Sequence, residues 1–221
     1  MKSINATVGE PPFPDRDCQI CPRLAAFRDE LREAEPDWHN APVPSFGPLD
    51  AGLLIVGLAP GMKGANRTGR PFTGDYAGDL LYATLAKFGF VTGDYDKRPD
   101  DGVTPIDCRI ANAVRCLPPQ NKPTTAEQRA CNGFLAQEIQ AMPKLKVILA
   151  LGRVSHDAVL RALGRRPADA RFGHGATHSL GAITMADSYH CSRYNTNTGR
   201  LTTEMFEAVI GGVRQELSPL R

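Results

Sequence analysis

The sequence predicts an α/β protein: a three-layer α/β/α sandwich around a central, mainly parallel four-stranded sheet. Short continuous apolar runs such as Leu53-Leu-Ile-Val56 are typical of parallel strands that are covered on both faces. Segments with apolar residues at helical spacing alternate with these runs, as expected of strand-helix units. The chain has 221 residues, 42% of them hydrophobic, which is enough for one core, so we expect a single domain over residues 1–221.

The first predicted elements follow an irregular arm. Residues 1–15 contain three prolines, which disfavour regular structure. A helix is predicted from Arg23, since apolar residues recur at helical spacing and a proline lies beyond its expected end: Leu24, Phe27, Leu31 and Pro36. The first strand, residues 53–56, leads into a glycine-rich loop, and residues 77–88 are predicted to return as a helix.

The remaining elements continue the alternation. Thr124 and Glu127 have the spacing of a capping box and predict the start of a helix. Gly164 is expected to close another helix. The predicted strands are 109–114, 146–151 and 183–185, and the predicted helices that follow them begin at 124, 154 and 201, the last one ending at 217.

The charge and hydropathy of the chain exclude some classes of protein. The 26 basic and 24 acidic side chains give a formal charge of +2, so a nucleic-acid partner would require a local basic surface. The sequence has no run of eighteen apolar residues and no N-terminal pattern of a secretory signal. We therefore expect a cytoplasmic protein without a membrane partner.

Four of the six cysteines form two separated pairs. Cys18 and Cys21 stand as Cys-x2-Cys before the first predicted helix, and Cys116 and Cys131 return as Cys-x14-Cys. The long gap fits a zinc knuckle poorly, whereas iron–sulfur clusters tolerate scattered spacing. Spacing alone leaves a cluster, a zinc ion and unconnected buried cysteines as alternatives. Four cysteine ligands leave no open coordination position, so neither metal centre need be catalytic.

A glycine-rich segment follows the first predicted strand. Gly57-Leu-Ala-Pro-Gly61 lets backbone amides approach a ligand closely, although the same pattern also suits a tight turn. The segment lacks the Gly-Lys-Ser/Thr ending of a phosphate-binding loop. It continues with two cations, an aromatic ring and a carboxylate: Lys63, Arg67, Phe72 and Asp75. Phe72 could instead fill the core, and Asp75 could instead cap a helix.

A second polar segment lies between the last predicted strand and the last predicted helix. Residues 189–200 contain a histidine, two arginines and two tyrosines, which suit contacts with a nucleic-acid backbone and groove. The alternative is a structural His190 beside Asn and Thr residues that merely form turns.

Three segments together resemble one family. They are Gly57–Gly61 running into Asn66–Asp75, then Asn112 before Cys116, and finally His190-x-Ser192-x-x-Asn195-Thr196. The chain resembles the family-5 (type B) uracil-DNA glycosylases, an iron–sulfur branch of the uracil-DNA glycosylase superfamily. This resemblance implies hydrolysis of the N-glycosidic bond of a uracil flipped out of DNA, which leaves an abasic site. It also implies that the four cysteines hold a [4Fe–4S] cluster.

The resemblance implies roles for the pocket residues. Phe72 would stack on the base and Asn112 would bind its Watson-Crick edge. His190 would donate to a uracil carbonyl, and the rest of the pocket would be formed by Gly57, Leu58, Ala59, Gly61 and Asn195. The family-5 pattern lacks the water-activating Asp or Asn of the first glycine motif, where this chain has Ala59. Asp75 is therefore the candidate for positioning or activating water.

The resemblance also implies how DNA binds. Arg193 and Tyr194 would lie against the bases beside the flipped nucleotide, and the phosphates would meet Lys63, Arg67 and Arg200. We expect a monomer that acts on duplex and single-stranded DNA containing uracil, with other deaminated bases such as hypoxanthine as further substrates. The alternative function is a non-catalytic iron–sulfur protein that binds nucleic acid and needs neither Asp75 nor His190. A phosphate-processing enzyme is disfavoured because the sequence shows no phosphate loop or paired metal-binding carboxylates.

Overall fold

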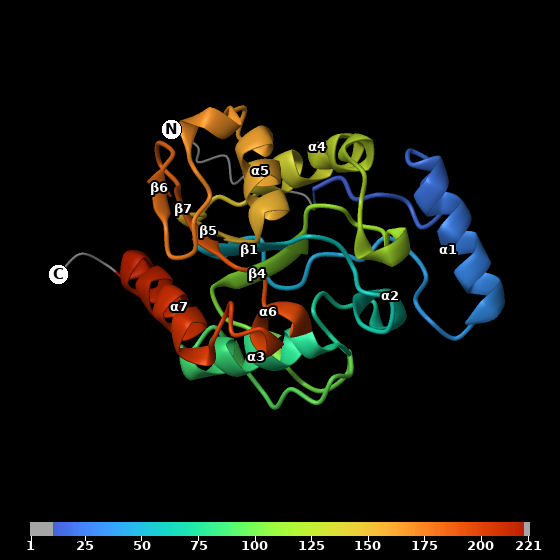
Figure 1. Ribbon diagram of the computed structural model, residues 1–221, viewed down its shortest axis with the longest axis horizontal. Helices are drawn as coiled ribbons and strands as arrows, with labels where there is room; N and C mark the ends of the chain where they lie inside the picture. The colour runs from blue at the N-terminus through green and yellow to red at the C-terminus, as the bar shows by residue number, and fades with distance from the viewer. Residues whose placement is uncertain (1–10, 219–221) are drawn as a thin grey trace, which may run out of the picture.

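A five-stranded sheet forms the centre of the computed structural model, which describes residues 11–218. The strand order is β4-β1-β5-β7-β6. The four strands β4, β1, β5 and β7 run parallel (Figure 1). Their bounds are Leu53–Gly57 for β1, Cys108–Asn112 for β4, Val147–Leu151 for β5 and Thr184–Ser188 for β7.

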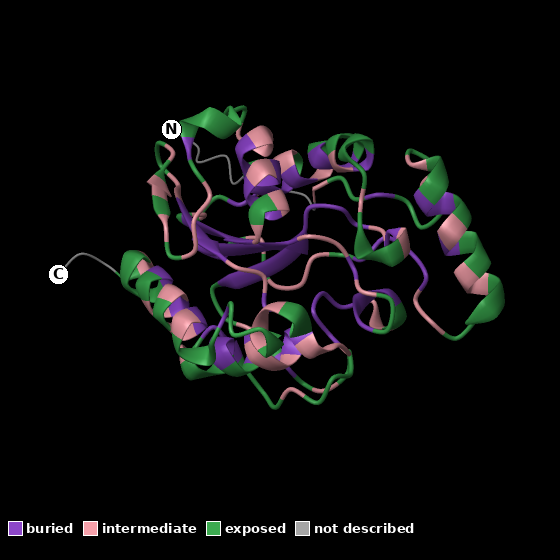
Figure 2. Cartoon of the chain, in the orientation of Figure 1, coloured by how far each residue is buried: buried purple, intermediate pink, exposed green. Residues whose placement is uncertain are grey.

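Helices cover both faces of the sheet. On one face α3 (Tyr76–Lys87) and α7 (Thr203–Leu217) pack against Leu53 and Ile55 of β1. On the other face α4 (Thr125–Ala141) and α5 (Arg153–Ala162) pack against Leu54 and Val56. Side chains of a strand alternate between faces, and every residue of β1, β4 and β5 is buried (Figure 2). The predicted three-layer α/β/α architecture is confirmed.

The predicted count of four strands is wrong by one. The additional strand, β6 (Thr177–Ser179), pairs antiparallel with β7 at the edge of the sheet. Its side chains are exposed or half-buried, so the segment lacks the apolar run that marks the buried strands. A separate two-stranded ribbon, β2 (Val91–Thr92) with β3 (Thr104–Pro105), was also not predicted, because each strand has only two residues.

Two short helices occupy segments without a predicted element. These are α2 (Ala65–Thr68), after the glycine-rich loop, and α6 (Arg193–Asn197), in the second polar segment. Short 3-10 turns span Pro119–Asn121 and Pro167–Asp169. The helix α1 (Pro22–Ala34) begins directly after Cys21, as predicted. Of the predicted irregular arm, residues 1–10 lie outside the described residues, and residues 11–15 form no helix or strand.

Gly211, the first of two adjacent glycines in α7, has a packing role. A Cβ atom on Gly211 would lie 3.2 Å from the ring of Phe88, which follows α3. Glycine therefore lets α7 lie close to the end of α3, and this offsets part of its low helix propensity. Gly212 faces open space, and nothing in the structure explains it.

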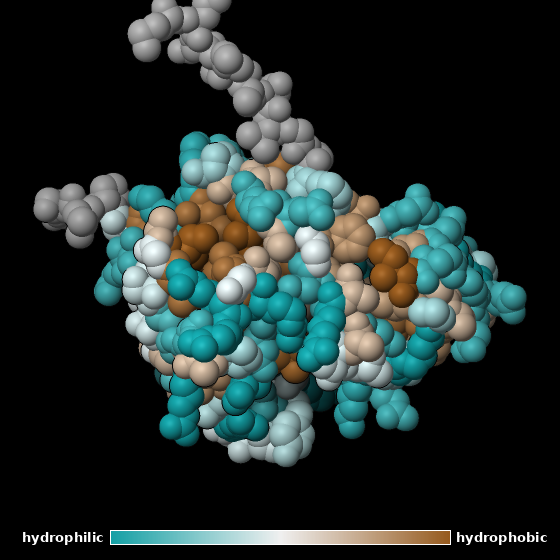
Figure 3. Space-filling view, turned by 90° about the horizontal axis from the view of Figure 1, so that it is seen from above, coloured by the Kyte–Doolittle hydropathy of each residue, from teal (hydrophilic) through white to brown (hydrophobic). Residues whose placement is uncertain are grey.

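The face of the molecule seen from above is mixed in polarity (Figure 3). Seen from above, most of the face is hydrophilic, and apolar side chains gather in separate patches (Figure 3). Among residues 11–218, none of the helices combines the length and the apolar composition that crossing a membrane requires.

Candidate active site

A pocket of about 500 Å³ opens at the carboxyl end of the parallel strands. Open α/β sheets bind ligands at this edge. The segments that follow β1, β4 and β7 all contribute to the wall. The pocket brings together most of the residues predicted for catalysis and base binding: Leu58, Ala59, Gly61, Phe72, Asp75, Asn112 and His190. Arg193, predicted to contact DNA, also lies in its wall.

Gly57 lies close to Phe72 and Asn112, two residues of the pocket wall. A Cβ atom at Gly57 would lie 2.5 Å from Cζ of Phe72 and 2.6 Å from Oδ1 of Asn112. Any side chain here would therefore displace both groups. Gly57 itself is not among the residues of the pocket wall, but its lack of a side chain lets the Phe72 ring and the buried Asn112 carboxamide lie close to its backbone.

Phe72 is held in an unusual backbone conformation. Its φ angle is +53°, which is rare for an aromatic residue and costs free energy. The hydroxyl of Tyr95 donates a hydrogen bond to the Phe72 carbonyl at 3.1 Å. The ring stacks against His190 with centroids 5.9 Å apart. Phe72 also belongs to the main apolar core, so its predicted alternatives, core packing and pocket lining, are both present.

Asp75 caps a helix and also lies in the pocket wall. One carboxylate oxygen, Oδ1, accepts a hydrogen bond from the Ala77 N–H at 3.1 Å and caps α3. The other, Oδ2, lies against the backbone of Gly61 and Gly64, where a Cβ atom would collide with it. Burial raises the pKa of this carboxyl, although the N–H groups of Ala77 and Gly78 act in the opposite direction. The carboxylate is thus positioned in the pocket by the helix that it caps.

His190 follows β7 and faces the pocket. Burial lowers the pKa of its imidazole to about 4, so the ring is neutral at pH 7. Within residues 11–218, neither ring nitrogen has a hydrogen-bond partner. A neutral imidazole has one N–H donor and one acceptor nitrogen. His190 therefore offers one hydrogen-bond donor and one acceptor to a ligand.

Asn195 lies behind His190. Its side-chain Nδ2 donates a hydrogen bond to the His190 carbonyl at 2.8 Å, and it is not among the residues of the pocket wall. Ser192 caps α6 by accepting a hydrogen bond from the Asn195 N–H. The Asn195 side chain thus holds the backbone at His190, and direct contact of Asn195 with a base stays a prediction.

The residues predicted to contact DNA lie in different places. The Arg193 guanidinium lies 5.4 Å from the centre of the Tyr76 ring, and Tyr194 beside it is 71% exposed. Arg200 lies over the ring of Tyr189 at 4.5 Å. Lys63 is exposed next to the glycine-rich loop. These positions leave all four residues available to a surface ligand.

Arg67 differs from the other predicted DNA contacts. It is exposed, but it lines a separate cleft with residues far from the pocket in sequence: Arg16, Trp38, Lys97 and Arg98. It is not among the residues of the pocket wall. A phosphate contact of Arg67 stays a prediction.

Some site residues were not predicted. Tyr76 and Asn121 line the pocket, and Tyr95 holds Phe72 in place. Tyr76 directly follows Asp75, and its position at the start of a helix beside the motif could have indicated it. Asn121 and Tyr95 lie in segments without a motif, so no signal in the sequence pointed to them.

The four paired cysteines converge. Cys18, Cys21, Cys116 and Cys131 line one small cavity between the start of α1, the segment after β4 and the first half of α4. Burial and the neighbouring Cys131 raise the pKa of the Cys21 thiol to about 11 and that of Cys116 to about 12. Four cysteine thiols in one cavity are the donor set of structural zinc sites and of iron–sulfur clusters. The donor set therefore suits a metal centre.

The spacing of the sulfur atoms favours a centre larger than one ion. Within residues 11–218, no three of these Sγ atoms lie within 4.8 Å of one another. Zinc bound tetrahedrally at about 2.3 Å requires sulfur atoms about 3.8 Å apart. Iron–sulfur clusters are also held by four thiolates but occupy more space. The sulfur atoms are thus more widely spaced than one tetrahedral zinc ion requires.

The fold and the site together define the class of this protein. The sequence model of the Uracil DNA glycosylase superfamily matches residues 44–213, and the chain belongs to that superfamily. Over 200 residues it is 44% identical to a type-5 uracil-DNA glycosylase of Thermus thermophilus, with 87% of this chain and 90% of the relative covered. The predicted resemblance is confirmed.

Other relatives agree with this placement. A type-5 uracil-DNA glycosylase of Pyrobaculum aerophilum is 38% identical over 199 residues, covering 88% of this chain and 86% of the relative. A type-4 enzyme of the same organism is also 38% identical, but over 152 residues that cover 68% of this chain and 63% of the relative. The similarity to type-5 proteins therefore extends over more of the chain.

Proposed function

We propose that this protein is a uracil-DNA glycosylase that hydrolyses the N-glycosidic bond of uracil flipped out of DNA. One observation carries the proposal: the Phe72 ring, the Asn112 carboxamide, the His190 imidazole and the Asp75 carboxylate share one pocket of about 500 Å³. The names of the type-5 relatives support it. The products are free uracil and an abasic site, because water replaces the base on the sugar.

Base binding requires a flipped nucleotide. The glycosidic bond is inaccessible inside the base stack, and unstacking costs a few kcal/mol. The Phe72 ring offers a face on which the base stacks, and Asn112 offers one acceptor and two donor hydrogens for the base edge. Ala59, Ala65 and Ala77 add small apolar walls. A pocket of small residues leaves room for other deaminated bases, so we expect hypoxanthine to be excised as well.

His190 stabilises the leaving group. Uracil departs with negative charge on its ring, and a neutral imidazole donor stabilises that charge without proton transfer. One donor of this type is worth about 3 to 4 kcal/mol in the transition state. The depressed pKa of His190 favours this role, because the neutral ring is retained well below pH 7.

Asp75 acts on the opposite side of the broken bond. As the base leaves, the sugar becomes oxocarbenium-like, and a nearby carboxylate stabilises its positive charge. The carboxylate also positions water for attack and accepts its proton, an effect of about 10²- to 10⁴-fold. Burial of Asp75 raises its pKa and so makes it a stronger base.

DNA binds to the surface around the pocket. Arg193 and Tyr194 lie at the start of α6, where they can occupy the place that the flipped base leaves. Lys63 and Arg200 are exposed and available to phosphates. We propose that the protein acts as a cytoplasmic monomer on duplex and single-stranded DNA that contains uracil.

We propose that the four converging cysteines hold a [4Fe–4S] cluster. Their shared cavity and the separation of their sulfur atoms support this cofactor. When bound, the cluster would cross-link the segment before α1, the segment after β4 and α4. The cysteine cavity and the uracil pocket share no lining residue, so the cluster would lie apart from the reacting bond.

The test is cleavage of a labelled duplex with one uracil opposite guanine, under single-turnover conditions and followed by alkali. Matched duplexes carry thymine or hypoxanthine at the same position. Strand breakage at uracil and hypoxanthine but not at thymine is the expected result. Absence of breakage, from protein that retains the visible absorbance of its cluster, would instead favour the non-catalytic binding protein.

A further inference from the structure

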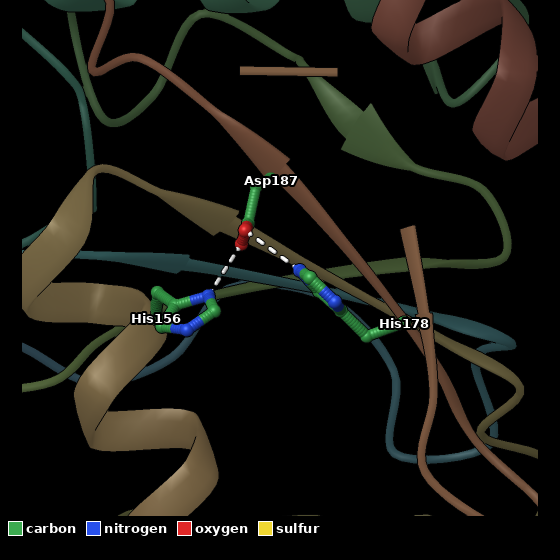
Figure 4. A group of neighbouring side chains, drawn as sticks. All are labelled: His156, His178 and Asp187. Carbon is green, nitrogen blue, oxygen red and sulfur yellow. Dashed lines mark hydrogen bonds and ion pairs between the residues drawn. The ribbon is translucent and has the colours of Figure 1, made fainter. Parts of the chain in front are cut away.

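Two histidines and an aspartate converge far from the cysteines. His156 lies on α5, His178 on β6 and Asp187 on β7 (Figure 4). The side chains of His156 and Asp187 are 1% and 0% exposed, and that of His178 is 16% exposed. None of the three lines the uracil pocket, so base excision does not explain why they are together.

The contacts of His156 call for a cation. Its Nδ1 atom lies 2.8 Å from Oδ1 of Asp187, and its Nε2 atom lies 3.2 Å from the Ala170 carbonyl oxygen. Both neighbours are oxygen atoms that only accept hydrogen bonds when Asp187 is ionised. A neutral imidazole has a single N–H and satisfies only one of them. The other contact requires either a second proton or a metal ion bound to the ring nitrogen.

Neighbouring backbone groups hold His156 and Asp187 in orientations that suit metal ligands. If Nε2 of His156 donates to the Ala170 carbonyl, Nδ1 presents its lone pair toward Asp187. Ligating histidines almost always donate their other N–H to a carbonyl or carboxylate in this way. The carboxylate is held in turn, since the Gly173 N–H donates to Oδ2 of Asp187 at 3.3 Å.

The distances suit a small divalent ion. His178 Nε2 lies 3.1 Å from Oδ2 of Asp187, and the ligand atoms of all three residues lie within 4.8 Å of one another. Zinc binds nitrogen and oxygen at about 2.0 to 2.2 Å, which places tetrahedral ligands about 3.3 to 3.5 Å apart. The two contacts of Asp187 with the histidines, 2.8 and 3.1 Å, would lengthen by a few tenths of an ångström to admit one ion between these side chains.

The group is also accessible. His178 lines a second pocket, of about 570 Å³, between β6, β7 and α7. That pocket shares no residue with the uracil pocket. The His178 side chain is 16% exposed on the edge strand β6, so an ion can reach the group from solvent at this edge. Two histidines and one carboxylate with an open position are a common donor set for transition metals.

We propose that His156, His178 and Asp187 form a binding site for one divalent transition-metal ion such as Zn²⁺. The ion joins α5 and the edge strand β6 to β7. The segment carrying His190 begins directly after β7, which ends at Ser188. Metal binding at this site therefore stabilises the part of the sheet from which the catalytic histidine projects.

The experiment titrates Zn²⁺ into cluster-loaded protein by calorimetry and follows thermal unfolding at the same concentrations. One saturable site beyond the iron of the cluster and a higher Tm are expected. His178→Gln should weaken binding at least tenfold, since loss of even an outer-shell partner typically costs 10- to 100-fold. The matched control is His174→Gln, because His174 lines the same pocket outside the ligand set and should leave the affinity unchanged.

His178 is the test position because it is the least buried of the three ligands. Circular dichroism of each variant without metal confirms that it is folded. The wild-type titration is decisive on its own if a variant fails to fold. Absence of a saturable zinc site in the wild type, or equal affinity in His178→Gln, would overturn the proposal and leave a hydrogen-bonded His-Asp-His group.

Discussion

The Asp75 carboxylate lies against the backbone of Gly61: a Cβ atom on Gly61 would stand 2.6 Å from Oδ2 of Asp75. This contact joins the glycine-rich loop after β1 to the start of α3. It explains in steric terms why the loop needs a glycine at this point. The absence of a side chain at Gly61 is what lets the carboxylate occupy the pocket.

Replacement of Gly61 should therefore act through Asp75. We expect Gly61→Ala to lower the single-turnover excision rate at least tenfold, because the added methyl group pushes the carboxylate away. The measurement is excision at saturating enzyme, with DNA affinity measured separately. Gly133→Ala is the control, since a Cβ atom at Gly133 on α4 meets nothing within 4 Å. Equal rates in both variants would show that the contact has no role in catalysis.

The charge of Asp75 is tested by Asp75→Asn. Asparagine is also a favourable N-cap, so α3 and the Tm should be nearly unchanged. The excision rate should fall at least tenfold, because the amide can neither accept the proton of water nor stabilise the positive sugar. If this variant excises uracil as fast as the parent, Asp75 has no part in the mechanism.

The pH dependence follows from the environment of His190. Burial lowers its pKa to about 4, whereas an exposed histidine titrates near 6.5. The neutral ring therefore persists as pH falls from 8 to 5, and protonation of His190 should cause no change in rate over this range. Single-turnover rates of the parent, measured from pH 8 to pH 5, should show no step near pH 6.5 that is caused by His190. A step caused by His190 would be present in the parent and absent in His190→Asn. Such a step would mean that His190 titrates as an exposed histidine.

The cysteine cavity predicts which thiols hold the cofactor. Cys116→Ser should lose iron and visible absorbance and unfold at a lower temperature, because one of four ligands is altered. Cys108→Ala is the control, since Cys108 is buried in β4 and is not among the residues of that cavity. Iron content per chain is the measurement. Full iron content in Cys116→Ser would remove Cys116 from the ligand set.

The parts of the fold that the sequence predicts well are those whose burial leaves a local signature. The buried strands β1 and β5 are continuous apolar runs, and α4 begins with the predicted capping box of Thr124 and Glu127. The edge strand β6 was missed because its polar residues resemble a loop. Its position depends on pairing with β7, which a local pattern does not reveal.

The same distinction applies to the site. Phe72, Asp75 and His190 stand in recognisable motifs, and the structure brings them into one pocket. Tyr95 lies 23 residues from the Phe72 carbonyl that it holds, in a segment without a motif. The group of His156, His178 and Asp187 comes from three separate elements. Contacts of this kind arise only when the chain is folded, so sequence patterns could not predict them.

The most direct test of the proposed activity is the single-turnover excision of uracil by the parent and by the double variant Asp75→Asn/His190→Ala, at concentrations where both bind the duplex fully. The parent should release uracil, and the double variant should be slower by about 10³-fold or more, because it lacks both the leaving-group donor and the carboxylate. An inactive parent with an intact cluster, or a double variant that keeps the parental rate, would contradict the account.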